Sequence, residues 1–169
     1  CDAVESAVSW KIALQRADGP SSLLFSRQGL PHQQRTAQQI ADIEKGGYIL
    51  RDSDNPQAIL IATGSEVSLA VEAHDELAAE GINTRVVSMP STNVFDRQSE
   101  NYRQSVLPDD VNARVVVEAG VSGGWYKYAG ARSAMVCLDT FGESGPAGEV
   151  FEHFGFNTAN VIKQVKSLL

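Results

Sequence analysis

The stretch Ala58-Ile59-Leu60-Ile61-Ala62-Thr63-Gly64-Ser65-Glu66-Val67 decides the fold class of this 169-residue chain. Residues 58–63 form a continuous run of the kind found in strands that are covered on both faces of a parallel sheet. Gly64 to Glu66 interrupt the run, and apolar residues then recur at helical spacing until Gly81 ends the helix. A buried strand followed at once by an amphipathic helix is typical of α/β domains.

The same alternation continues outward along the chain. Further strands are predicted at 48–50, 84–88, 113–118 and 134–138, and helices at 95–105, 146–154 and 158–169. With the central strand these make five strands that alternate with helices. The pattern predicts a three-layer α/β/α domain with a mixed, mostly parallel five-stranded sheet.

The N-terminal part of the chain has a different pattern. Its opening residues predict a helix that lacks a natural start, and a short buried strand is predicted at 22–26. Residues 28–44 are polar and rich in Gln, with a helical turn expected around 38–43. We therefore expect residues 1–27 to be the tail of a preceding domain, 28–44 a linker and 45–169 the C-terminal domain, all within a longer polypeptide.

Composition excludes several classes of partner. The formal charge is −7 and the sequence pI is near 4.9, whereas a nucleic-acid binder needs a basic face. No apolar run approaches the roughly 20 residues that span a bilayer, so we expect neither a nucleic acid nor a membrane as partner. Cys1 and Cys137 are too few for a disulfide framework, which favours a reduced, intracellular protein with Cys137 buried.

Most candidate motifs favour a structural interpretation. Gly64-Ser65-Glu66 could bind an anion at the start of a helix, but Glu66 in the first turn disfavours a bound phosphate. We therefore predict that Ser65 caps the following helix. The aromatic cluster at 125–128 is expected to pack at a domain interface, and His74 lies on an apolar helical stripe. Gly142-Glu143-Ser144-Gly145 is one residue short of a nucleophile elbow. Glu118, at the end of a strand, is a weak candidate acid without a partner in sight.

Arg27 is the strongest candidate ligand contact. It ends the predicted strand at 22–26 and is followed at once by Gln28-Gly29. A guanidinium at the end of a strand offers a planar fork of donors that suits a phosphate or a carboxylate. A structural ion pair is the alternative role for this side chain. No base paired with a nucleophile emerges, so the sequence predicts no catalytic residue and no metal or cofactor ligand.

The chain resembles transketolases in a series of motifs that keep the order of that family from residue 4 to the C-terminus. They are Leu24-Phe25-Ser26-Arg27-Gln28, Ile61-Ala62-Thr63-Gly64-Ser65-Glu66-Val67, Arg85-Val86-Val87-Ser88-Met89-Pro90-Ser91-Thr92, Phe95-Asp96-Arg97-Gln98, Val117-Glu118-Ala119-Gly120, Trp125-Tyr126-Lys127-Tyr128, Thr140-Phe141-Gly142-Glu143-Ser144 and Phe154-Gly155-Phe156. Gly145 is a departure, since the family usually has Ala before this Pro.

The resemblance implies the C-terminal portion of a cytoplasmic, homodimeric transferase of the pentose phosphate pathway. Such an enzyme moves a two-carbon ketol unit from a ketose phosphate to an aldose phosphate. It uses thiamine diphosphate with Mg²⁺ or Ca²⁺, both held by the missing N-terminal and middle domains. Only Arg27 carries over as a functional residue, as the contact to the sugar phosphate. The resemblance therefore implies that this chain alone binds no cofactor, is inactive and supports packing and dimerisation, with Trp125 and Tyr126 as contacts to the missing domains.

Two alternatives remain open at this point. The first is the C-terminal domain of another thiamine diphosphate enzyme, such as a 2-oxoacid dehydrogenase β chain or deoxyxylulose-phosphate synthase. These share the expected fold but are less expected to carry Met89-Pro90-Ser91-Thr92. The second alternative is a stand-alone regulatory α/β module that binds a ligand.

Overall fold

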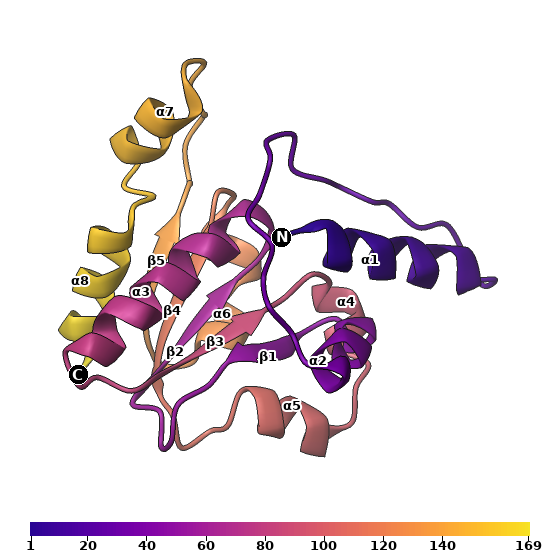
Figure 1. Ribbon diagram of the computed structural model, residues 1–169, viewed down its shortest axis with the longest axis horizontal. Helices are drawn as coiled ribbons and strands as arrows, with labels where there is room; N and C mark the ends of the chain where they lie inside the picture. Colours follow the sequence, from indigo (N-terminus) through magenta and orange to yellow (C-terminus); the bar gives the residue numbers. More distant parts are fainter.

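The computed structural model describes residues 1–169 and contains one mixed sheet of five strands with helices on both faces (Figure 1). The strands are β1 (Tyr48–Arg51), β2 (Ala58–Ala62), β3 (Thr84–Ser88), β4 (Ala113–Glu118) and β5 (Arg132–Cys137). Their order is β1-β3-β2-β4-β5, with β1 antiparallel to β3 and all other pairs parallel. The predicted α/β class and the five predicted strands are confirmed.

Helices form the outer layers. They are α1 (Ala3–Gln15), α2 (Ala37–Asp42), α3 (Val67–Ala79), α4 (Thr92–Phe95), α5 (Glu100–Val106), α6 (Tyr126–Ala129), α7 (Ala147–His153) and α8 (Thr158–Leu168), with 3₁₀ turns η1 (Ile43–Lys45), η2 (Gly64–Glu66) and η3 (Ser122–Gly124). One apolar core joins the sheet to α3 and α8, and a second joins its other face to α4, α5 and α6. The sheet is therefore the middle of three layers.

The central strand β2 shows why the sequence folds this way. All five of its residues are fully buried, so the apolar run is covered on both faces as predicted. Ala58, Leu60 and Ala62 belong to the core under α3 and α8, while Ile59 and Ile61 belong to the opposite core. This alternation follows from the two-residue period of a strand.

The direction of winding reverses around β2. The chain passes from β2 through α3 to β3 on one side, and from β4 through α6 to β5 on the other. In open α/β sheets, ligands bind where such a reversal separates the carboxyl ends of neighbouring strands. Here those ends are the segments that follow Ala62 of β2 and Val117 of β4, which are paired in register.

Two predictions for the N-terminal part are wrong. Asp2 caps α1 by accepting a hydrogen bond from the Glu5 amide at 3.1 Å, so the helix has a proper start. Residues 22–26 do not form a buried strand: no strand of the sheet pairs with them, and the Leu24 side chain is 90% exposed. Without a ladder partner or a covering layer, the segment gains neither hydrogen bonds nor burial.

Residues 28–44 are more than a surface linker. The predicted helical turn is α2, but Arg35 upstream of it has a side chain only 1% exposed. Its guanidinium donates to Asp2 Oδ2 at 2.7 Å and to the Tyr48 hydroxyl at 2.8 Å. The Tyr48 hydroxyl in turn donates to Glu5 Oε1 at 2.8 Å. We call these residues, together with Ser88, whose hydroxyl also donates to Glu5 Oε1, the Arg35 cluster; it joins α1 to the sheet.

The other boundary predictions differ in detail. The predicted helix over 95–105 is two helices, α4 and α5, and the Ser99 side chain caps α5 by accepting a hydrogen bond from the Tyr102 amide. The predicted C-terminal helix is confirmed as α8. Residues 139–149 form an exposed arm that carries α7 away from the body of the molecule (Figure 1), with Phe141 99% exposed at its surface.

Candidate functional site

Arg27 lies in a bend and its side chain is exposed. No hydrogen bond or ion pair of the structure involves its guanidinium, whereas Arg16, Arg35 and Arg85 each bind a carboxylate. The structural alternative, an ion pair that occupies Arg27, is therefore not formed in this structure. Its five donors are free to meet an anion.

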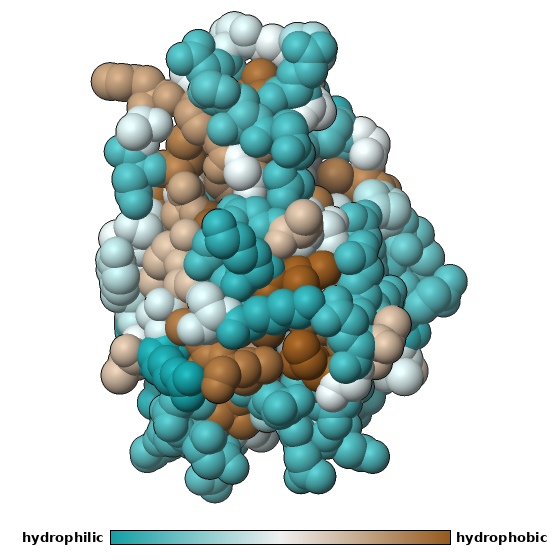
Figure 2. Space-filling view, turned by 90° about the vertical axis from the view of Figure 1, so that its left-hand side faces the viewer, coloured by the Kyte–Doolittle hydropathy of each residue, from teal (hydrophilic) through white to brown (hydrophobic).

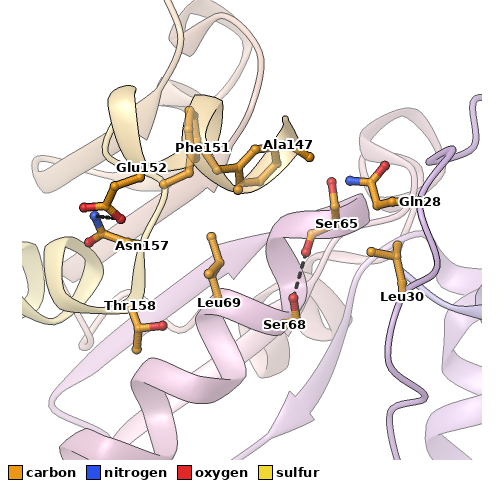
Figure 3. A pocket seen from close by; sticks show the side chains of 12 residues that line it. Gln28, Leu30, Ser65, Ser68, Leu69, Ala147, Phe151, Glu152, Asn157 and Thr158 are labelled. Carbon is orange, nitrogen blue, oxygen red and sulfur yellow. Dashed lines mark hydrogen bonds between the residues drawn. The ribbon is translucent and has the colours of Figure 1, made fainter. Parts of the chain in front are cut away.

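The loop that carries Arg27 lies alongside the start of α3. A methyl group at Gly64 would stand 3.7 Å from Ser26 Oγ, so residues 26–28 pass close to the turn after β2. Gln28 lines the same cavity as Ser65, and Figure 3 shows its amide directed toward the Ser65 side chain. Arg27 thus lies between two residues that are near the turn at the carboxyl edge of the sheet.

Beside this contact is an open cavity of about 350 Å³. Leu30 and Leu69 approach it from the loop and from α3, and Phe151 approaches it from α7 (Figure 3). Phe156, between α7 and α8, also lines it. The view from the side of α7 and α8 shows apolar side chains reaching the surface between polar ones (Figure 2). The volume is within the range of small-ligand pockets, and no local sequence pattern signals it because its walls come from three distant segments.

Glu66 is the buried acid at the turn after β2. It is 3% exposed, its Oε1 accepts a hydrogen bond from Ser65 Oγ at 2.5 Å, and its Oε2 accepts one from the Ala119 amide at 3.3 Å. Burial raises the pKa of this carboxyl, and the two hydrogen bonds oppose that effect. The prediction that Ser65 caps the helix is wrong, since its hydroxyl binds Glu66 and α3 has no side-chain cap.

Glu118 has an acidic neighbour, Glu66, that the sequence did not reveal. It ends β4, and burial together with the neighbouring Glu66 raises its pKa to about 7. Opposite Glu118 in the sheet register is Cys137, whose pKa is raised to about 11 by burial and by the charges of Glu118 and Asp139. Glu66 is near enough for its charge to raise the pKa of Glu118, because parallel strands bring their carboxyl ends to one edge.

The remaining sequence candidates are structural. His74 is buried and its Nδ1 lies 2.8 Å from Thr84 Oγ1; burial lowers the pKa of its imidazole, so the prediction of a core histidine is confirmed. Trp125 and Tyr128 are buried in the core under α6, so Trp125 is not available to another domain, whereas Tyr126 is 61% exposed. Cys137 is half-buried rather than buried.

The chain does not offer a site that fits a metal diphosphate. No group of three or more His, Cys, Asp or Glu side chains is arranged to hold a metal ion. We therefore assign no chemical step in this chain to thiamine diphosphate or its cation. No helix is both long and apolar enough to pass through a bilayer.

Comparison with known proteins places this arrangement among transketolases. Residues 46–157 match the family model described as the transketolase-like TK C-terminal domain. Over its whole length the chain is 59% identical to transketolase 1 of Vibrio vulnificus, of which it covers 26%. A transketolase of Pichia stipitis solved with sedoheptulose 7-phosphate is 39% identical and superposes with a TM-score of 0.91, over 99% of this chain and 24% of that one.

A further solved relative is described as inactive. It is described as a split-gene transketolase in an inactive β₄ tetramer, is 27% identical and has a TM-score of 0.65. The match covers 85% of this chain and 48% of that one. The present chain spans about a quarter of the length of the curated relatives that it matches.

Proposed function

This chain belongs to the transketolase family through its C-terminal domain, and from that premise we propose that it is the C-terminal part of a ketol-transferring enzyme. The reaction moves a two-carbon ketol unit from a ketose phosphate to an aldose phosphate. Its relatives at 57–59% identity are transketolases, which favours this function over other thiamine enzymes and over a stand-alone regulatory module.

The observation that carries the proposal is the free guanidinium of Arg27. The substrates of the reaction share a terminal phosphate, and an unpaired arginine binds phosphate through parallel, charge-assisted hydrogen bonds. Arg27 is exposed and unpaired, and its loop is supported by the turn at Gly64. In this proposal Arg27 orients the sugar by its phosphate and takes no part in proton transfer.

The cofactor belongs to the whole enzyme in this proposal. Thiamine diphosphate supplies a carbanion that accepts the ketol unit, and Mg²⁺ or Ca²⁺ holds its diphosphate. We propose that both are bound by parts of the protein other than this chain, within a homodimer in the cytoplasm. Residues 1–27 would then complete the preceding domain, 28–44 connect it, and 45–169 form the C-terminal domain.

The isolated chain is expected to be inactive. The relative described as a split-gene transketolase in an inactive β₄ tetramer supports this expectation. Ketol transfer from a ketose phosphate should be absent from the purified chain with thiamine diphosphate and Mg²⁺. It should be present in the full-length protein that contains the chain; turnover by the chain alone would overturn the proposal.

Arg27→Ala tests the role of the arginine. In the full-length protein, losing a bidentate contact to phosphate should raise KM for the phosphorylated donor about 10- to 100-fold, which corresponds to the usual strength of charge-assisted hydrogen bonds. Arg97→Ala is the matched control, because Arg97 is another exposed arginine whose guanidinium makes no hydrogen bond or ion pair in the structure. Equal KM values for the two variants would refute the assignment of Arg27 as the phosphate contact.

A further inference from the structure

The loop at residues 26–30 lies near the turn after β2 and the start of α3 at several points. Ser26 faces Gly64, and Gln28 and Leu30 line one cavity with Ser65 and Leu69. Figure 3 shows this arrangement, with the loop on one side and the first turns of α3 on the other. The contacts on both sides of Arg27 thus come from the C-terminal domain, although Arg27 precedes that domain in the chain.

Gly64 is the residue of this turn whose backbone conformation favours glycine. Its φ of +56° lies in the left-handed region, where residues with a Cβ are strained. The left-handed turn directs the chain from β2 into η2 and places its backbone against Ser26. The following residue, Ser65, is held by Glu66, which is itself bound to the Ala119 amide at the end of β4. The surface that meets the loop is therefore anchored in the sheet.

We propose that Gly64 and Gln28 are positioning residues for Arg27, so that the carboxyl edge of this sheet sets the affinity of the enzyme for the phosphate of its substrates. This inference rests on the proposed function, because it assumes that Arg27 binds that phosphate. The loop is otherwise weakly held: Leu24 and Phe25 before it are exposed, and no strand pairs with it. An arginine on such a segment binds well only if its backbone is fixed before the ligand arrives.

The test uses Gln28→Ala and Gly64→Ala in the full-length protein, with Gly81→Ala as the matched control. Gly81 ends α3 with a φ of +80°, and a methyl group added there would meet no other atom within 4 Å. Its replacement therefore brings the same backbone strain far from the loop. Steady-state kinetics are measured with a ketose phosphate and with the same ketose lacking its phosphate.

For Gln28→Ala and Gly64→Ala, KM for the ketose phosphate should rise about five- to tenfold while kcat stays within about twofold, because only binding through Arg27 is affected. KM for the dephosphorylated ketose should not change. Gly81→Ala should match wild type with both substrates. In an Arg27→Ala background the two substitutions should have no further effect, since residues that act through one group are not additive.

The outcomes separate this inference from the proposed function. If the wild-type protein transfers no ketol unit, the proposed function fails. If wild type is active and both positioning variants keep its KM for the ketose phosphate, the inference alone is overturned. A rise in KM that is equal for the phosphorylated and dephosphorylated ketoses, or that persists in the Arg27→Ala background, also overturns it, because the effect would then not pass through Arg27.

Discussion

At the scale of single residues, the carboxyl ends of the strands raise the pKa of two acids, Glu66 and Glu118. Burial raises the pKa of Glu66 in the turn after β2, and partial burial together with the charge of Glu66 raises the pKa of Glu118 at the end of β4. A raised folded-state pKa means that the folded protein binds the proton more tightly than the unfolded chain does. The stabilisation is therefore fully present below the unfolded pKa and is lost as pH rises through the folded value.

Glu118→Gln tests this linkage. Between pH 4.5, the ordinary pKa of the side chain, and about pH 7, the wild-type free energy of unfolding should fall with rising pH. The substitution should flatten this decline and raise the free energy of unfolding at pH 8 by about 1–2 kcal/mol. This is less than the full shift in the pKa of Glu118 implies, because the side chain is partly exposed. Urea unfolding at several pH values measures it. The control is Glu149→Gln on the exposed arm; a flattening of equal size there would contradict the explanation.

At the scale of elements, α1 is held to the sheet by a few buried polar groups. Burial alone would raise the pKa of Asp2, but its hydrogen bonds with Arg35, Gln33 and Glu5 hold that pKa below its usual value. Arg35 stands between two carboxylates and the Tyr48 hydroxyl with almost no exposure to water. Removing one partner from a buried ion pair strongly destabilises the folded protein, because the other charge is left uncompensated.

Arg35→Ala should therefore destabilise the protein by about 3–5 kcal/mol, because it leaves Asp2 buried without the guanidinium that lies 2.7 Å from its carboxylate. Urea unfolding gives the magnitude, and amide hydrogen exchange should show α1 losing protection first. Lys166→Ala is the control: it removes the exposed pair with Glu80 and should cost no more than about 1 kcal/mol. A loss for Arg35→Ala as small as for the control would mean that the cluster does not hold α1.

The elements of the sheet could be predicted from the sequence, and several contacts of the candidate site could not. The run at 58–63 predicts β2 because burial on both faces leaves a local pattern. The strand predicted at 22–26 also has an apolar centre, Leu23-Leu24-Phe25, yet no strand pairs with it in this chain. Arg27 could be singled out by its chemistry, but the meeting of Glu118 with Glu66 depends on strand order, which no local pattern encodes.

At the scale of the whole molecule, apolar side chains gather on the N-terminal segment. Trp10 and Phe25 stack with ring centroids 6.3 Å apart, and Leu14 and Leu24 are 80% and 90% exposed. Contiguous exposed apolar groups of this kind mark interaction surfaces. In the proposed enzyme this surface packs against the rest of the preceding domain.

Leu14→Gln with Leu24→Gln tests that packing. Because both side chains are exposed, the stability of the isolated chain should change by less than about 1 kcal/mol. Binding to a separately produced upstream part of the enzyme, measured by calorimetry, should weaken about tenfold or more, since two leucines would no longer be buried. Lys163→Gln on the exposed side of α8 should leave the affinity unchanged. Unchanged affinity in the leucine variant would show that this surface lies outside the interface.

Asp2 does more than cap α1. Its Oδ2 also accepts a hydrogen bond from the Gln33 amide at 2.9 Å, across a separation of 31 residues. The Asp2 carboxylate thereby links the two ends of the segment that carries Arg27. Linking the two ends of a segment reduces its conformational entropy by an amount that grows only slowly with its length. This entropy is lost when the protein folds, before any ligand binds. Arg27 therefore lies on a segment whose two ends are linked, although no hydrogen bond or ion pair joins Asp2 to Arg27 itself.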